Sequence, residues 1–210
     1  MTWGEQNTEA EAWEQLDAFL EAGGNFIDTA ELYPVPPVRA TAGRTERFIG
    51  NWLASKPPGF REKLVIATKV SRVAACSAVR SADRALTQLL QKVAGPCSKS
   101  RDYLVAFRRE ATGGGAGPAD DLPQLSPAQI ADGVDASLKR LQIESIDLIQ
   151  LHWPERYTPT FGKSIYSYAK ARKNEHDVRG VMEMTPFEEQ LRGVAAVLKA
   201  GKVKHWGVSN

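Results

Sequence analysis

Four short apolar segments, in which polar and apolar residues do not alternate, limit the fold more than any other feature. The segments are 25–30 (NFIDTA), 63–69 (KLVIATK), 146–153 (IDLIQLHW) and 203–210 (VKHWGVSN). Strands of a parallel sheet that is covered by helices on both faces have this pattern. We therefore predict four parallel strands, each buried on both faces.

Helices are predicted between these strands, and three of them begin with the same pattern. Thr8 (TEAE), Ser126 (SPAQ) and Thr185 (TPFE) each precede a Glu or Gln by three residues. Such capping boxes satisfy free backbone groups of the first helical turn, and a proline suits the first helical position of the last two. A fourth helix is predicted over about 44–54. Helices and strands therefore alternate, which is repeated β/α architecture.

Composition narrows the function classes. The chain has 210 residues, 42% of them apolar, and a net charge of +2, so we expect one core and no nucleic-acid partner. The spacing of the two cysteines, Cys76 and Cys97, fits neither a zinc motif nor a disulfide framework, and we expect no metal site. No apolar run reaches the ~20 residues that span a bilayer. We expect no membrane partner and a cytoplasmic protein, with an organellar location open if a targeting segment precedes Met1.

Polar residues collect at the C-terminal ends of the predicted strands. They are Asp28, Lys69, His152 and the pair Ser209 and Asn210. A (β/α)₈ TIM barrel builds its site from such residues along one rim, whereas an open sheet binds mainly at one switch point. No G-x-G-x-x-G follows any strand, which also argues against the dinucleotide-binding open sheet. We predict the α/β class and the TIM barrel.

Four ordered motifs resemble one family. They are FIDTAELYP (26–34), VIATK (65–69), LIQLHWPERY (148–157) and GKVKHWGVSN (201–210). Together they resemble the aldo/keto reductases, and within them the Tas-type branch of bacterial and plant members. The resemblance implies a (β/α)₈ barrel that reduces an aldehyde or ketone with NADPH. It also implies four catalytic residues, which by motif are Asp28, Tyr33, Lys69 and His152.

Elementary chemistry is consistent with these roles. Reduction of a carbonyl leaves charge on oxygen, so an acid is needed, and Tyr33 is the candidate. Its reference pKa of ~10 is high, and we expect the Lys69 ammonium to lower it. Asp28 would keep Lys69 charged and aligned. His152 lies in an apolar segment, where desolvation favours a neutral imidazole that can donate a hydrogen bond to the carbonyl.

The resemblance also implies the cofactor contacts. Ser209 and Asn210 would hold the carboxamide of the nicotinamide, and Gln6 and Asp28 would lie beside the cofactor. The cofactor would be NADPH (NADP⁺) and the substrate a small carbonyl compound. Trp153, next to His152, would contact the substrate.

The chain departs from the family pattern at both ends. Strands 2 to 5 and the end of the loop after strand 1 are present, whereas strands 6 to 8 are absent. We expect a single partial barrel domain over 1–210, and its truncation puts activity in doubt. Two other readings stay open: a non-catalytic, aldo/keto reductase-like interaction subunit, and a gene-model fragment.

A third departure is internal. Residues at about 70–92 fit no family segment, and Lys-Val occurs on both sides of the segment, at 69–70 and 92–93. The segment is either a retained intron or a surface insertion. Lys92 precedes VAGP as the catalytic lysine would, but Lys69 follows a buried strand and is preferred. The glycine-rich stretch 111–123 lacks the context of a phosphate loop and is predicted to be a plain loop.

Overall fold

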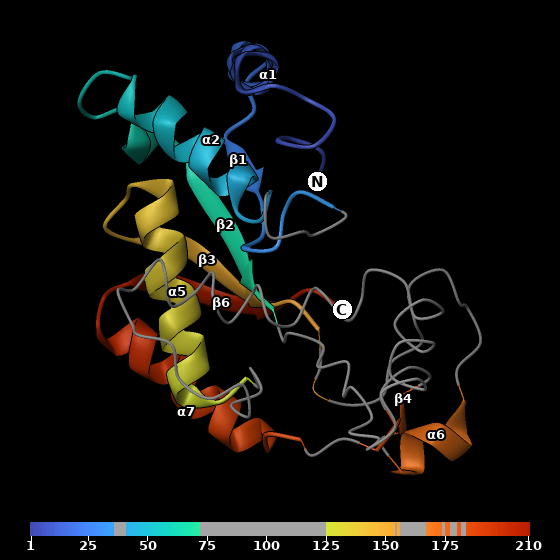
Figure 1. Cartoon of the computed structure of the whole chain (residues 1–210). Helices are drawn as coiled ribbons and strands as arrows, with labels where there is room; N and C mark the ends of the chain where they lie inside the picture. The colour runs from blue at the N-terminus through green and yellow to red at the C-terminus, as the bar shows by residue number, and fades with distance from the viewer. Residues whose placement is uncertain are drawn as a thin grey trace.

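A four-stranded parallel sheet forms the centre of the molecule (Figure 1). The computed structural model describes residues 1–35, 41–71, 125–153, 155, 167–173, 175–176, 180–181 and 184–210. The strand order is β1-β2-β3-β6, with all three neighbouring pairs parallel. The strands are β1 (Phe26–Asp28), β2 (Val65–Val70), β3 (Ile146–Leu151) and β6 (Val203–Val208).

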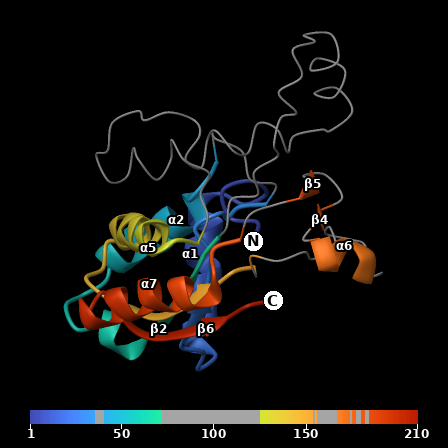
Figure 2. The same cartoon turned by 90° about the horizontal axis from the view of Figure 1, so that it is seen from below.

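Four helices connect or flank these strands. They are α1 (Glu9–Glu21), α2 (Arg44–Ala54), α5 (Pro127–Leu141) and α7 (Phe187–Lys199). Helices α2, α5 and α7 lie on one side of the sheet (Figure 2). The smaller elements are the 3₁₀ turn η1 (Arg61–Lys63), α6 (Tyr168–Lys173) and the antiparallel pair β4 (Glu175–His176) and β5 (Gly180–Val181).

Two of the three predicted helix caps are confirmed. Thr8 Oγ1 accepts from the Glu11 amide at 3.3 Å, and the Glu11 carboxylate accepts from the Thr8 amide at 2.7 Å. Ser126 Oγ accepts from the Gln129 amide at 3.3 Å.

The third predicted cap, at Thr185, is wrong. Helix α7 has Pro186 as its N-cap, with no side-chain cap bond. The Thr185 amide instead donates to Glu155 Oε2 at 2.6 Å, and both residues are buried. A buried carboxylate from the segment after β3 therefore fixes the start of α7, and a local sequence pattern carries no sign of such a distant partner.

Burial of the strands follows their place in the sheet. Strand β2 is buried along most of its length, as predicted. The same prediction is wrong for β1 and β6, where Phe26 is 48% and Val208 61% exposed. Within the described residues these two strands pair on one side only, and the barrel is not closed. The parallel β/α order otherwise confirms the predicted class, with a sheet that matches a truncated (β/α)₈ barrel.

The apolar core lies between the sheet and the helices. Helix α2 approaches α5 closely at Gly50, where an added Cβ would lie 2.2 Å from the Arg140 carbonyl oxygen. The largest fully buried apolar side chains are Trp52, Ile49, Ile66, Leu125, Ile130, Leu141, Ile146, Ile149 and Val70. Close helix approach and dense apolar packing together hold the helical layer against the sheet.

One ion pair is buried within this layer. Arg140 Nε of α5 bonds to Glu46 Oε2 of α2 at 2.6 Å, and their side chains are 5% and 0% exposed. Glu46 Oε1 also accepts from Thr68 Oγ1 of β2 at 2.6 Å. The carboxylate thus joins two helices and a strand, and removal of either partner leaves a buried charge uncompensated.

Arg140→Met is therefore expected to lower the free energy of unfolding by about 3–5 kcal/mol, because Glu46 would stay buried without its cation. The matched control is Arg192→Met, which breaks an exposed pair with Glu189 and should cost about 1 kcal/mol or less. Urea unfolding of the three proteins measures both values. Equal losses for the two variants would contradict the role given to the buried pair.

Several predicted features lie outside the described residues. They are the unassigned residues from 72 to 92, Lys92, the glycine-rich stretch 111–123 and both cysteines. Val70 itself lies in β2 and pairs in register with Leu151. The single partial domain over 1–210 and the inserted segment remain predictions. Among the helices of the described part, none is long and apolar enough to cross a membrane.

Candidate active site

Strand register places the predicted polar residues on one face of the sheet. Asp28 lies opposite Ala67, and Lys69 lies opposite Gln150. Since side chains alternate between faces with a period of two, Asp28, Lys69 and Gln150 share one face near the C-terminal end of the sheet. The other face carries apolar residues toward the helices, among them Ile27, Ile66 and Ile149.

Lys69 is the charged centre of this group. Its side chain is 6% exposed, and its ammonium forms an ion pair with Asp28 and donates to the Thr29 carbonyl oxygen at 2.8 Å. Gln150 Nε2 donates to the other oxygen of Asp28 at 2.8 Å. Side chains from β2 and β3 therefore hold Asp28, and Asp28 in turn positions the Lys69 ammonium.

Tyr33 lies on the loop after β1 and is buried beside Lys69. The Lys69 Nζ atom is 5.4 Å from the centre of the Tyr33 ring. We expected Lys69 to lower the pKa of Tyr33, and this is wrong: burial first, and then the charge of Asp28, raise it above its usual value. The ammonium lies near the ring and is bonded to Asp28, so its effect does not outweigh desolvation. Tyr33 is therefore a protonated phenol at neutral pH.

His152 follows β3 directly and meets Tyr33. The two rings are 6.0 Å apart between centres, in an edge-to-face arrangement, and the Trp153 ring stacks on His152 with its centre also 6.0 Å away. Burial, and then the charge of Lys69, lower the pKa of His152 to about 4. The imidazole is therefore neutral at pH 7, as expected from its apolar segment.

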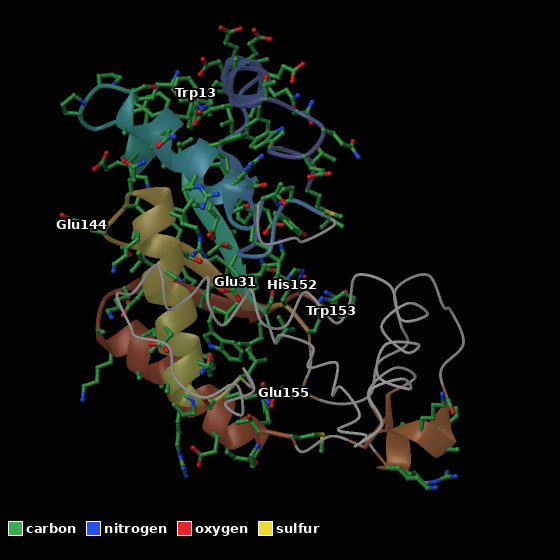
Figure 3. All side chains as sticks on the ribbon, in the orientation of Figure 1. Trp13, Glu31, Glu144, His152, Trp153 and Glu155 are labelled. Carbon is green, nitrogen blue, oxygen red and sulfur yellow. The ribbon has the colours of Figure 1, made fainter. Side chains whose placement is uncertain are left out.

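Two residues that the sequence reasoning missed adjoin His152. Glu31 is fully buried and accepts from the Ser71 amide at 2.6 Å, and Ser71 Oγ lies 2.7 Å from His152 Nδ1. Figure 3 shows Glu31 and His152 close together, near the ends of β2 and β3. A buried glutamate is unusual enough to suggest a role, but its position within DTAEL gave no sign of its partner.

The predicted cofactor residues divide into two groups. The Ser209 amide donates to the Leu151 carbonyl oxygen at 3.1 Å, and Asn210 Nδ2 donates to the His152 carbonyl oxygen at 2.8 Å. Both residues therefore lie beside the end of β3. Gln6 lies in the N-terminal turn, where its amide donates to the Thr2 carbonyl oxygen at 2.9 Å, and its side chain is exposed. Nothing in the described contacts joins Gln6 to the group around Lys69.

The fold and these residues define a parallel β/α protein with a polar site at the carboxyl ends of its strands. The aldo/keto reductase family model matches residues 1–210, so the chain belongs to the aldo/keto reductase family. This confirms the family indicated by the four motifs. Within the described residues, no three His, Cys, Asp or Glu side chains gather as a metal site would require.

Individual relatives agree with this family. Protein tas of Escherichia coli is 37% identical over 210 residues, which is 100% of this chain and 46% of that protein. An aldo-keto reductase of Babesia bovis is 38% identical over 89 residues, 41% of this chain and 30% of that protein. The chain therefore spans about half the length of Protein tas, and its match covers 30% of the Babesia bovis protein.

A solved structure shares the fold. It is the aldo-keto reductase AKR11C1 from Bacillus halodurans in its holo form, with a TM-score of 0.50 and 21% identity. The match covers 98% of this chain and 43% of that one. At this identity, the match supports the fold alone.

The low pKa of His152 predicts a pH dependence of stability. The unfolded chain binds a proton below about pH 6.5 while the folded imidazole stays neutral to about 4, so lowering the pH favours unfolding. Because of His152, the free energy of unfolding should fall by roughly 2 kcal/mol when the pH is lowered from 7 to 5. Denaturant unfolding at both pH values should show a smaller loss for His152→Gln than for the wild type. His205→Gln, at an exposed site, is the control and should keep the wild-type loss.

Proposed function

We propose that this polypeptide takes part in NADPH-dependent reduction of an aldehyde or ketone to an alcohol, with Tyr33 as the general acid. The observation that carries the proposal is the ion pair between the buried Lys69 and the partly exposed Asp28, next to a protonated tyrosine and a neutral histidine. Membership of the aldo/keto reductase family supports the reaction class. The chain spans 46% of Protein tas of Escherichia coli, so the activity of a whole enzyme is part of this proposal.

Each of the four residues has a distinct part in this proposal. Tyr33 donates its phenolic proton to the carbonyl oxygen as negative charge develops there. The Lys69 ammonium stabilises the phenolate that remains, and Asp28 holds Lys69 in position. The neutral His152 donates a hydrogen bond that orients the carbonyl group. When bound, NADPH supplies the hydride to the carbonyl carbon.

The residues present fit the nicotinamide end of such a cofactor. Asn210 is fixed through its Nδ2 atom to the His152 carbonyl oxygen, which holds its side-chain amide beside the backbone of the proposed orienter. An amide oxygen and a serine hydroxyl are suitable partners for the carboxamide of the nicotinamide. The preference for NADPH over NADH rests on the family, as does a role for Gln6.

Tyr33→Phe tests the acid directly. We expect carbonyl reduction to fall at least about 100-fold, because general acid catalysis of this kind contributes 10²–10⁴-fold, while NADPH affinity stays within about twofold. Steady-state NADPH oxidation with a panel of aldehydes and ketones gives the rate, and NADPH fluorescence gives the affinity. Both are measured on the 210-residue chain and on any longer polypeptide that transcripts of the gene encode.

The outcomes of this experiment separate the readings that the sequence leaves open. Full turnover by Tyr33→Phe would exclude Tyr33 as the acid. Binding of NADPH without reduction of any carbonyl compound would favour a non-catalytic interaction subunit. Activity of a longer polypeptide alone would identify the 210-residue chain as an incomplete part of a reductase.

Lys69→Met tests the ion pair. It removes the cation beside Tyr33 and leaves Asp28 without its partner, so we expect kcat to fall at least about 100-fold. Lys202→Met is the matched control, because Lys202 pairs with Asp135 at a half-exposed site away from the group around Lys69. The control should retain wild-type kcat in the same assay. A loss common to both variants would point to stability, and Lys69→Met with wild-type kcat would contradict the role of the ammonium.

A further inference from the structure

The buried link between Glu31, Ser71 and His152 has no part in the chemistry described so far. Glu31 is fully buried on the loop after β1, and its amide donates to the Lys69 carbonyl oxygen at 3.3 Å. Its carboxylate accepts from the Ser71 amide at 2.6 Å. Glu31, on the loop after β1, therefore holds Ser71, which follows β2, through a charge-assisted hydrogen bond.

Ser71 in turn reaches His152 across the next strand pair. Its Oγ lies 2.7 Å from Nδ1, and the His152 amide donates to the Val70 carbonyl oxygen at 3.0 Å. Ser71 is fully buried and His152 is 7% exposed, so water has little access to this bond. Both the backbone and the ring of His152 are therefore tied to the end of β2.

A neutral imidazole carries one proton, on Nδ1 or on Nε2, and the partner of one nitrogen decides which. A hydroxyl that donates to Nδ1 requires that nitrogen to be bare, so the proton must lie on Nε2. A hydroxyl that accepts from Nδ1 would leave Nε2 without a proton. The direction of this one bond therefore decides whether the ring can donate through Nε2.

We propose that Ser71, positioned by Glu31, donates its hydroxyl proton to His152 Nδ1 and so fixes the imidazole as the Nε2–H tautomer. Ser71 is then a positioning residue, which acts through His152 and does not touch the substrate. The value of this tautomer for catalysis rests on the proposed function, since a hydrogen bond to the carbonyl needs the Nε2 proton. The direction of the Ser71–His152 bond is likewise inferred from that function, whereas the tautomer itself can be measured in the free chain.

Nitrogen NMR of the ¹⁵N-histidine-labelled chain tests the proposal without cofactor or substrate. At pH 7.5 we expect His152 to show a bare, pyridine-type Nδ1 and a protonated, pyrrole-type Nε2. His152→Gln assigns the signals among the three histidines. A protonated Nδ1 of His152 in the wild type would overturn the proposal, and this result does not depend on any Ser71 variant.

Ser71→Ala should let the ring sample both tautomers, so that its two nitrogen shifts move toward each other. Ser71→Thr, which keeps a hydroxyl, should restore the wild-type pattern. Ser145→Ala is the matched control, because Ser145 Oγ is buried without a hydrogen-bond partner among the described residues and should leave His152 unchanged. An unchanged wild-type pattern in Ser71→Ala would show that Ser71 does not select the tautomer.

An activity measurement then separates this proposal from the proposed function. In a protein that reduces carbonyl compounds, Ser71→Ala should lower kcat/KM about 3- to 10-fold, the usual value of one hydrogen bond, and Ser71→Thr should recover it. Absence of any reduction with the expected tautomer present would count against the function alone. Full activity with a protonated Nδ1 would count against the tautomer alone.

Discussion

The site depends on a lysine ammonium that is almost removed from water. Lys69 needs partners at that depth, because an isolated buried charge is costly. The carboxylate of Asp28 and the carbonyl oxygen of Thr29 provide them, and both come from the end of β1 and the residue after it. The partners of the Lys69 ammonium are therefore in place only when β1 pairs with β2. The loop that carries Tyr33 follows directly from the strand that this pair fixes.

Parallel register converts this local pair into a site along several strands. The residues at the C-terminal ends of β1, β2 and β3 come to one edge of the sheet, and the period of two puts Lys69 and Gln150 on the same face as Asp28. The opposite face packs on α2, α5 and α7 and carries the core. Glu46 and Arg140 anchor that layer with a buried ion pair, on the side away from the site.

Local sequence patterns were enough to predict some of this arrangement, but not the contacts between distant segments. Capping residues and apolar segments predicted α1, α5 and the four strands, and polar residues at strand ends predicted Asp28, Lys69 and His152 as neighbours. Glu31 and Ser71 were missed because their partners lie about 40 to 80 residues away, and no periodicity records such contacts. The start of α7 at Pro186 was missed for the same reason, since Glu155 holds it from another segment. The exposure of β1 and β6 depends on what lies next to them in the sheet, which their own residues do not specify.

Solvation explains why four neighbouring ionisable groups differ in charge. Asp28 and Lys69 form an ion pair, in which the partly exposed Asp28 carboxylate offsets the cost of burying the Lys69 ammonium. At Tyr33 and His152 desolvation is the largest influence, and burial raises the pKa of the phenol and lowers that of the imidazole. Both are therefore neutral and carry a proton that can be donated. The charge of Lys69 lowers the pKa of His152 further, so the ammonium helps to keep the imidazole from protonation. In the proposed reaction, the same cation would also stabilise the phenolate that Tyr33 becomes when it donates its proton.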